Sequence, residues 1–501
     1  MGVFDFFKRK PQKSPMGRNY YGANQGRLFA DFVAPANSAD STLRLALPVL
    51  RDRSRDLARN NEYAKRYLNL IKTSVVGERG FTLQVRARND DRALDAPGNA
   101  IIENAFKSWG RLGNPEVSGR MSWLDCQRFV AETLARDGEV FIKKVQNKQL
   151  KDGFGIQFIE SDLIDHDKND TLENGNTIRM GVELNQFHKP VAYHVLTEHP
   201  NDLFYTASMQ KREHIRVPAD EMIHIFMPGR SFQTRGEPFM APVISNLKQL
   251  DGFIEAELVS ARAAAAKFGI ITTPNGDDFV GDDETDQGVP IIDFDPGSVH
   301  QLPRGHDFQM VEGHHNAAFD DFVKGVLRGI ASGLNVSYTS LSNDLQGVSY
   351  SSIRQGTIDE RDHMKLLQSF LIQHFCEPIF RSWLDSALDF GNIPIPRNKY
   401  DKFSDNIHFR GRGFAWVDPS REINANVAAL QNGLISLNDV AANYGKDVEE
   451  LFGQIQSDKE MAERFGLKLA FEPFGGGISP YGAMKVTPEM LEEMDDEDAD
   501  N

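Results

Sequence analysis

The apolar residues of this chain recur with two spacings, and each spacing predicts one kind of element. Intervals of three and four residues predict long helices at 48–75, 242–268, 316–334 and 352–388. Shorter segments of the same kind predict helices at 424–432, 437–444 and 448–465. Asp418 as N-cap and Pro419 at the first helical position predict that a helix begins there. Alternating apolar residues between turn residues predict strands at 138–145, 155–160, 180–184, 191–196, 223–226 and 407–411. The sequence therefore predicts an α+β fold, with residues 185–190 as a hairpin turn.

A polar segment, residues 335–352, separates two of these helices and is too rich in Ser, Thr and Asn to form a core. A polar segment of this length between long helices is usually either functional or disordered. The regular helical patterns on both sides favour function. The candidate functional side chains are Ser337, Tyr338, Thr339, Ser340, Ser342, Asn343, Gln346, Ser349 and Ser351.

The two helices beside the polar segment contain residues that are unusual in helices. Gly325, Gly329 and Gly333 are spaced four apart in the preceding helix, where each interior glycine costs roughly 1 kcal/mol relative to alanine. The repeat indicates that another backbone packs closely along this stripe; a loosely packed helix with a glycine cap is the alternative. In the following helix, Pro378 lies inside a continuing apolar pattern, which predicts a kink rather than an end.

Charge is distributed unevenly along the 501 residues. The net charge is −16, but residues 1–92 alone carry 18 basic and 9 acidic residues, which leaves −25 for the remainder. Four arginines at 51, 53, 55 and 59 could contact phosphate, or they could form a solvated or subunit-facing helix surface. An acidic chain with local basic regions suits a protein along which DNA slides better than a tight, sequence-reading binder.

Two acidic runs contain eight acids each and no base, residues 277–295 and 489–500. The first run is a candidate docking surface, although a plain solvated loop is equally compatible with its composition. The acids proposed for docking are Asp277, Asp278, Asp282, Asp283, Glu284 and Asp286.

Motifs of enzymes are absent or weak. No GxxxxGK, HExxH or GxSxG occurs, and the S-x-x-K match at Ser245–Lys248 falls on a predicted helix and is common by chance. Cys126 and Cys376 are too far apart in sequence for a metal pair or a disulfide framework, and they fit a reducing cytosol. No apolar run is long enough to predict a membrane span. A weak metal candidate is the group His300, His306, His314 and His315. We therefore expect neither a cofactor nor a metal.

Several motifs, in this order along the chain, resemble those of lambda-type portal proteins of tailed bacteriophages. The resemblance covers most of residues 45–465. The motifs that carry it are residues 51–61 with 75–77, 223–226, 235–242, 333–344, 350–354 and 416–419.

The resemblance implies a portal-like subunit with an α/β wing, a two-helix stem, a small clip, a long kinked helix and a helical crown. The implied parts are a mobile N-terminal arm (1–45), wing (46–236), stem helix (237–270), clip (271–310), returning stem helix (311–334), tunnel loop (335–352), kinked helix and wing strand (353–417), crown (418–472) and disordered acidic tail (473–501).

The resemblance also implies partners and a location. They are further copies of the chain in a ring, a dodecamer in that family, at one capsid vertex of a virion assembled in the host cytoplasm. Double-stranded DNA would pass through without base recognition, and the terminase large subunit, the major capsid and scaffold proteins and a head–tail adaptor would bind; no membrane is involved. The alternatives are a hydrolase or nuclease with an α+β catalytic domain, and a cytosolic DNA-binding scaffold, which the acidic remainder of the chain disfavours.

Overall fold

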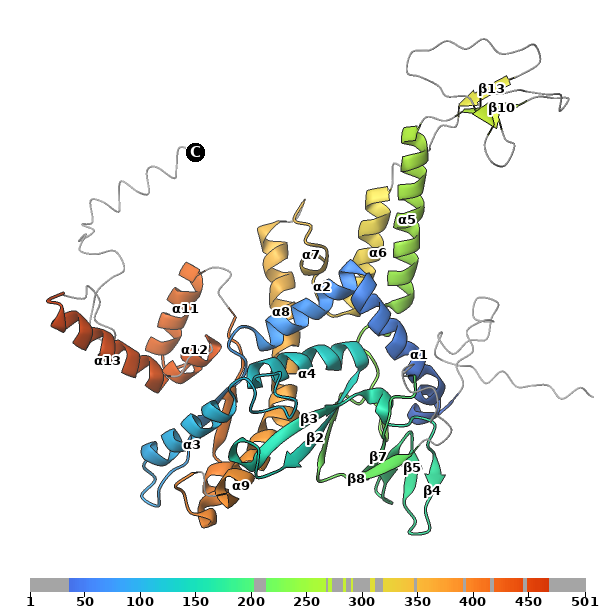
Figure 1. Cartoon of the computed structure of the whole chain (residues 1–501). Helices are drawn as coiled ribbons and strands as arrows, with labels where there is room; N and C mark the ends of the chain where they lie inside the picture. Colours follow the sequence, from blue (N-terminus) through green and yellow to red (C-terminus); the bar gives the residue numbers. More distant parts are fainter. Residues whose placement is uncertain are drawn as a thin grey trace, which may run out of the picture. The chain divides into compact units, whose positions relative to one another are not determined.

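The predicted mixture of helices and strands is present in the structure, a computed structural model (Figure 1). The chain forms two compact units, Met1–Arg412 and Gly413–Asn501. The residues that the structure describes are 36–201, 213–266, 269–272, 283–284, 290–291, 307–310, 319–346, 349–390, 393–414, 419–444 and 448–467.

The first unit begins with two helices where the sequence predicts one. Helix α1 (Ala39–Asn60) and helix α2 (Glu62–Ile71), which a π-helical turn at Lys72–Val76 extends, are separated at Asn61. The Asn61 backbone is extended, and its side chain accepts a hydrogen bond from the Ala64 N–H, so it caps α2. Because α1 already starts at Ala39, residues 39–45 are helical and do not belong to a mobile arm, contrary to the prediction. Residues 1–35 of that arm lie outside the described residues.

Two antiparallel sheets follow, and they contain the predicted strands except the one at 407–411. The smaller sheet has the order β3–β2–β9, with β2 (Glu139–Gln146) between β3 (Phe154–Ile159) and β9 (Met222–Phe226). The five-stranded sheet is a meander in which the predicted hairpin joins β6 to β7. Its strands are β4 (Asp170–Thr171), β5 (Thr177–Arg179), β6 (Val182–Leu184), β7 (Pro190–Leu196) and β8 (His214–Pro218).

An aromatic core joins three helices of the first unit. The Phe106 ring stacks on Trp109 at 5.3 Å and meets Trp123, Phe380 and Trp383 edge-on. The helices concerned are α3 (Ala96–Trp109), α4 (Trp123–Asp137) and α9 (Glu377–Asp389). Strand β1 (Thr82–Val85) pairs with β14 (Ile407–Arg410), so two segments far apart in sequence lie side by side.

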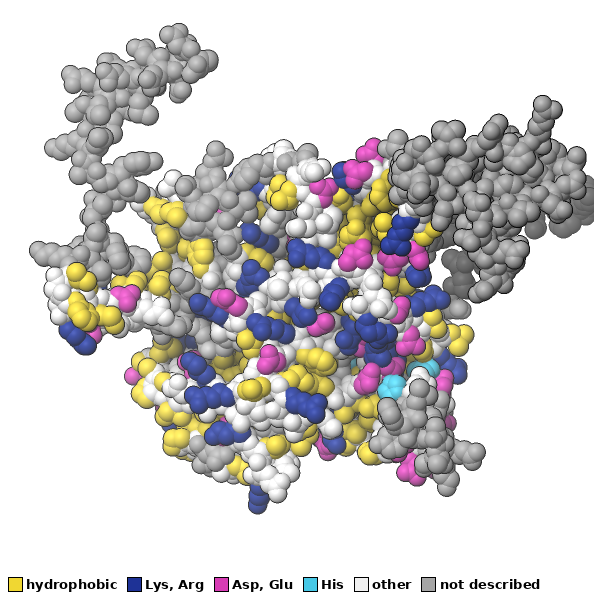
Figure 2. Space-filling view, turned by 45° about the horizontal axis from the view of Figure 1, so that its top comes forward, with side chains coloured by type: hydrophobic (Ala, Val, Ile, Leu, Met, Phe, Trp, Pro, Cys, Tyr) yellow, Lys and Arg dark blue, Asp and Glu magenta, His cyan; other side chains and the backbone are white. Residues whose placement is uncertain are grey.

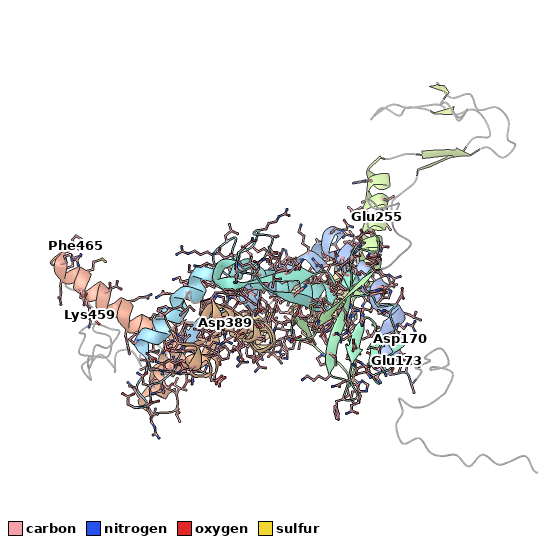
Figure 3. All side chains as sticks on the ribbon, turned by 60° about the horizontal axis from the view of Figure 1, so that its bottom comes forward. Asp170, Glu173, Glu255, Asp389, Lys459 and Phe465 are labelled. Carbon is pink, nitrogen blue, oxygen red and sulfur yellow. The ribbon has the colours of Figure 1, made fainter. Side chains whose placement is uncertain are left out.

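Two long helices run antiparallel beside each other, α5 (Ile244–Ala266) and α6 (Phe319–Gly333) (Figure 1). Phe253 of α5 stacks on Phe319 at 5.5 Å near the start of α6, while Val243 lies against Gly333 at the end of α6. Glu255 marks the middle of α5 in Figure 3. The strands that the structure describes between these helices are β10 (Gly269–Thr272) paired with β13 (Asp307–Met310), and β11 (Asp283–Glu284) paired with β12 (Pro290–Ile291).

The long helix predicted over 352–388 is present in two parts. Helix α8 (Tyr350–Leu371) continues through a π-helical turn at Ile372–Cys376 into α9. The Glu377 N–H bonds to the Ile372 carbonyl, five residues back, directly before Pro378, which has no N–H to donate. The helical irregularity thus lies beside the proline. Shorter helices are η4 (Lys151–Gly153), η5 (Ser161–Leu163), η7 (Arg397–Lys399) and α10 (Tyr400–Ser404).

The second unit consists, in its described residues, of the three predicted helices α11 (Pro419–Gln431), α12 (Leu437–Asn443) and α13 (Val448–Arg464). Pro419 is the first residue of α11, as predicted, while its predicted cap at residue 418 lies outside the described residues. Many of the large apolar side chains described in this unit are exposed, among them Phe465 after α13 (Figure 3). Within the described ranges, no helix combines the length and apolarity needed to cross a bilayer.

Candidate functional site around α7

The polar segment between α6 and α8 is not a loop throughout, because it contains the short helix α7 (Tyr338–Ser342). The Ser337 hydroxyl caps this helix by accepting a hydrogen bond from the Ser340 N–H at 3.1 Å. Asn343 ends it in the left-handed conformation with φ 57°, and its N–H bonds to the Thr339 carbonyl. Serine is a frequent N-cap, so Ser337 could have predicted this turn.

The side chains proposed as functional divide into a half-buried and an exposed group. The half-buried hydroxyls are bonded locally: Ser337 donates to the Ser340 hydroxyl at 2.8 Å, and Ser342 donates to the Tyr338 carbonyl at 2.7 Å. Thr339 is also half-buried, beside Ser337. The exposed members are Asn343, Gln346, Ser349 and Ser351, of which Ser349 caps the N-terminus of α8. The Ser349 hydroxyl also bonds to the hydroxyls of Ser351 and Ser352, at 3.0 and 2.9 Å. The exposed group can reach a ligand more easily than the half-buried hydroxyls.

Three other helices hold α7 in place (Figure 1). From α2, the Arg66 Nε donates to the Ser340 carbonyl at 2.9 Å, although the two residues are 274 positions apart. From α8, the Glu360 carboxylate accepts the Ser337 N–H at 3.1 Å. These bonds hold the backbone of the polar segment at the N-cap and in the middle of its short helix.

Two basic side chains of α6 also contact the polar segment. The Tyr338 hydroxyl donates to Asp344 at 2.9 Å, and Lys324 lies 3.7 Å from the same carboxylate. The N–H of Gln346, the Tyr338 hydroxyl and Lys324 together hold the pKa of Asp344 below its usual value. The Arg328 guanidinium lies over the Tyr338 ring, 5.4 Å from its centroid.

The positive charge beside α7 comes from elements that sequence reasoning did not connect with it. Residues 335–346 contain no base, whereas Arg66, Lys324 and Arg328 surround them from α2 and α6. Arg66 and Arg328 are exposed. On the face shown in Figure 2, basic side chains are widely spread and interleaved with acidic and apolar ones. On this face the distribution provides weak, dispersed attraction for a polyanion.

The glycine stripe of α6 does not pack closely against another backbone of the described chain, and its close packing between copies in a ring stays a prediction. An added Cβ would meet nothing within 4 Å at Gly325 or Gly329, and at Gly333 it would lie 2.5 Å from a methyl of Val243. The acids proposed for docking are not tested, because only Asp283 and Glu284 lie within the described residues and only their backbone is described, as strand β11. The four candidate metal-binding histidines also lie outside the described residues.

The arginines at the start of the chain divide by role, and two of them do not face solvent. Arg51 is fully buried and pairs with Glu139 at 3.2 Å and with Asp162 at 2.6 Å. Arg55 pairs with Asp137 at 3.0 Å and also with Asp162. Phosphate contact is therefore ruled out for Arg51 and Arg55 in this fold, since their charges attach α1 to the sheet; residues 53 and 59 are exposed.

Glu139 is the centre of this buried network. Arg235 contacts it at 2.6 Å, His224 at 3.1 Å and the Gly236 N–H at 3.1 Å, and the side chains of Glu139 and Arg235 are fully buried. Burial acts to raise the pKa of Glu139, but the charge of Arg235 and the bonds from His224 and Arg235 hold it far below its usual range. Burial lowers the pKa of His224. The network fixes the turn at residue 235 from which α5 follows.

We expect acid to destabilise the fold progressively. The pKa of His224 is lowered, so the unfolded chain takes up that proton first, and stability declines as the pH falls below the ordinary value of 6.5. The depressed pKa of Glu139 adds a contribution that is complete above its ordinary value of 4.5 and is lost as the pH falls through the folded value. Urea unfolding at several pH values tests this; a midpoint that stays constant or rises from pH 7.5 to pH 4 contradicts it.

One group within the described residues has the geometry of a cation site. Ligand atoms of Glu160, Asp162 and His199 all lie within 4.8 Å of one another. However, Arg55 already pairs with Glu160 at 3.3 Å and with Asp162, so the negative charge is neutralised without an ion. The arrangement is explained as part of the ion-pair network.

Comparison with known proteins identifies the family. A family model described as phage portal protein, lambda family, matches residues 25–368. A probable portal protein of Halomonas phage phiHAP-1 is 34% identical over 496 residues, which cover 97% of this chain and 94% of that protein. Portal protein B of Escherichia phage lambda is 22% identical, covering 89% and 90%. Solved structures are more distant: a chain in the neck of an empty GTA particle has a TM-score of 0.41 and 11% identity, covering 78% of this chain and 93% of that chain.

The sequence matches place the chain among the structural, non-enzymatic proteins of phage virions. More particularly, the chain belongs to the lambda family of phage portal proteins. This membership confirms the resemblance identified from the sequence motifs, and the hydrolase or nuclease alternative is wrong.

Proposed function

We propose that the chain is one subunit of a homo-oligomeric ring, twelvefold as in its family, that conducts double-stranded DNA through one vertex of a phage head during packaging and ejection. Its membership of the portal family supports this proposal. The observation that carries it is the position of α7, a polar turn held between α2, α6 and α8 at the base of the α5–α6 pair.

We assign the subdomains on the same basis. The wing contains both main sheets and starts at residue 39 rather than 46, because α1 begins there. The pair α5–α6 is the stem, residues 271–310 are the clip, and the α7 region is the tunnel loop. The helices α8 and α9 form the kinked helix, and α11–α13 form the crown.

In this proposal the channel contacts DNA through exchangeable polar groups. Asn343, Gln346, Ser349 and Ser351 are exposed and offer hydrogen bonds to phosphate oxygens, and the exposed guanidinium groups of Arg66 and Arg328 lie close by. Contacts with phosphates position a duplex but carry no sequence information, so DNA of any sequence can pass. The acidic remainder of the chain limits the total attraction and lets the duplex move.

The docking partners follow from the proposed subdomains. The clip, with its acidic run at 277–295, is the proposed docking surface for the terminase large subunit and later for the head–tail adaptor. The wing and crown would face the major capsid protein and the scaffold protein. Such acidic surfaces favour partners with complementary basic patches and fast association.

Replacing exposed polar groups of the segment by leucine should impair packaging and leave assembly intact. In a Gln346→Leu, Ser351→Leu variant we expect at least about tenfold fewer DNA-filled heads, because two phosphate-binding groups are lost and apolar groups line the path. Counting filled and empty heads by electron microscopy, after complementation of a portal-deficient phage, measures this. Gln149→Leu, at an exposed glutamine after β2, is the matched control. Normal filling by the double variant, with rings present, would refute the channel role of this segment.

A further inference from the structure

Two exposed phenylalanines and a histidine form an aromatic patch on the wing, which we define as Phe187, His188 and Phe232. Phe187 is 76% exposed and Phe232 is 67% exposed, and the ring centroids of His188 and Phe232 are 4.5 Å apart. His188 belongs to the turn between β6 and β7, and Phe232 belongs to the loop after β9. The contact between His188 and Phe232 therefore brings the two segments together, and Phe187 directly precedes His188 in the chain.

The backbone at this patch adopts conformations that large side chains rarely take. His188 has φ 59° and Phe232 has φ 60°, both in the left-handed region that favours glycine. In addition, the Nδ1 atom of His188 is buried and has no hydrogen-bond partner among the described residues. An unusual backbone that holds apolar rings in water is typical of a binding surface.

The loop that carries Phe232 also holds the beginning of the described chain. The Arg230 guanidinium donates to the Asn37 carbonyl at 3.1 Å. The Thr234 N–H and hydroxyl both donate to Asp40, at 2.8 and 2.7 Å. Residues preceding Ala36 therefore leave the fold beside the loop that contains the patch.

Those preceding residues have the composition that the patch requires. Residues 27–35 contain Phe29, Phe32 and Val33, and Phe32 and Val33 lie only three or four positions before Ala36. An extended chain spans about 3.5 Å per residue, which gives these side chains a reach of about 14 Å from Ala36. Because the segment is tethered, its effective concentration at the patch is in the millimolar range, well above that of an untethered partner.

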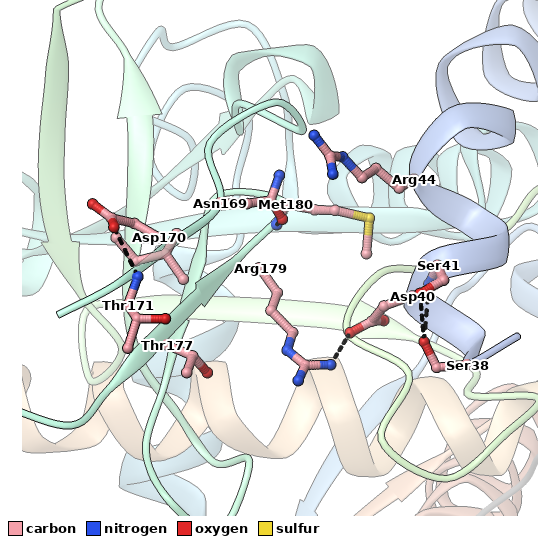
Figure 4. A pocket seen from close by; sticks show the side chains of 11 residues that line it. Ser38, Asp40, Ser41, Arg44, Asn169, Asp170, Thr171, Thr177, Arg179 and Met180 are labelled. Atoms are coloured by element: carbon pink, nitrogen blue, oxygen red, sulfur yellow. Dashed lines mark hydrogen bonds and ion pairs between the residues drawn. The ribbon is translucent and has the colours of Figure 1, made fainter.

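A hollow near the start of α1 is an alternative docking place for this segment, and it suits the segment less well. It has a volume of about 620 Å³ and lies between α1 and the β4–β5 hairpin (Figure 4). Its lining includes Asp40 and Arg179, which face each other at 3.5 Å, together with Arg44 and Asp170. Apolar side chains would desolvate these charges without compensation.

We propose that residues 29–33 dock intramolecularly on the aromatic patch, with their phenylalanine rings against Phe187 and Phe232. The N-terminal segment then covers the loop that leads from β9 to the stem helix α5. The chain start is thereby fastened at the place where the wing joins the stem.

Hydrogen exchange of residues 27–35 tests the docking. In the full chain at a concentration where it is monomeric, we expect these amides to exchange at least tenfold more slowly than in a Phe187→Ser, Phe232→Gly variant. Glycine at position 232 removes the ring and suits the positive φ, so the loop should keep its fold. The matched control is Leu45→Ser, which removes an 83% exposed apolar side chain from α1 and should leave the exchange unchanged.

Two results would overturn the proposal. One is equal exchange of residues 27–35 in the wild-type chain and in the double variant. The other is protection that appears only in the assembled ring, which would assign the segment to a neighbouring copy. Both are independent of the channel role of α7, since neither measurement involves DNA.

Discussion

Glu139→Gln should lower the free energy of unfolding by about 3–5 kcal/mol. The substitution removes the negative charge but keeps the shape, so the fully buried Arg235 and Arg51 lose the charge that compensates them. A buried guanidinium cannot lose its proton in the way that a carboxyl can gain one, and its desolvation is therefore uncompensated. The three elements α1, β2 and the turn before α5 depend on this one carboxylate.

Urea unfolding of the Glu139→Gln variant, followed by far-ultraviolet circular dichroism, measures the loss. The matched control is Glu160→Gln, because the Glu160 side chain is 51% exposed and pairs with Arg55 at 3.3 Å. An exposed pair of this kind contributes at most about 1 kcal/mol. Equal effects of the two substitutions would show that the buried network does not hold the wing together.

Gly138→Ala should be nearly as damaging, through sterics rather than charge. Gly138 ends α4 with φ 86°, and a Cβ added there would lie 2.1 Å from the carbonyl carbon of Glu237. The obstacle is backbone, which cannot rotate away, and it belongs to the turn that precedes α5. We expect a loss of about 3 kcal/mol or more, because the contact between the α4–β2 junction and that turn must open.

A second glycine separates this clash from simple backbone strain. Gly175 has φ 82°, but an added Cβ would meet nothing within 4 Å. Gly175→Ala should therefore cost only the left-handed conformation, about 1–2 kcal/mol. The soluble yield and urea midpoint of both variants distinguish the clash from backbone strain. If Gly175→Ala is as unstable as Gly138→Ala, the close approach of Gly138 to Glu237 is unimportant for stability.

Local periodicity predicted the long elements because their burial follows directly from the spacing of apolar residues. Helices α5 and α6, the continuous pair α8–α9 and strands β2, β3 and β7 lie within a few residues of the predicted ranges. The hairpin between β6 and β7 and the proline at the start of α11 are set by neighbouring residues, and they were predicted as well.

Long-range contacts could not be predicted in this way. The roles of Arg51 and Arg55 depend on Glu139 and Asp162, which lie about a hundred residues further on, so a row of arginines suggested a surface instead. The positive charge beside α7 likewise comes from Arg66, 274 residues before its partner. The break at Asn61 was missed because the apolar pattern continues across it, although asparagine is a frequent helix cap.

The central claim is that copies of this chain form a portal ring, and the mass and shape of the assembled protein test it most directly. Native mass spectrometry with negative-stain imaging should find hollow rings of about 680 kDa, twelve times the subunit mass of 56.3 kDa. Such rings, with a central channel, are the result that the account predicts. A compact monomer or dimer at every concentration, also when the capsid and scaffold proteins are co-expressed, would contradict it.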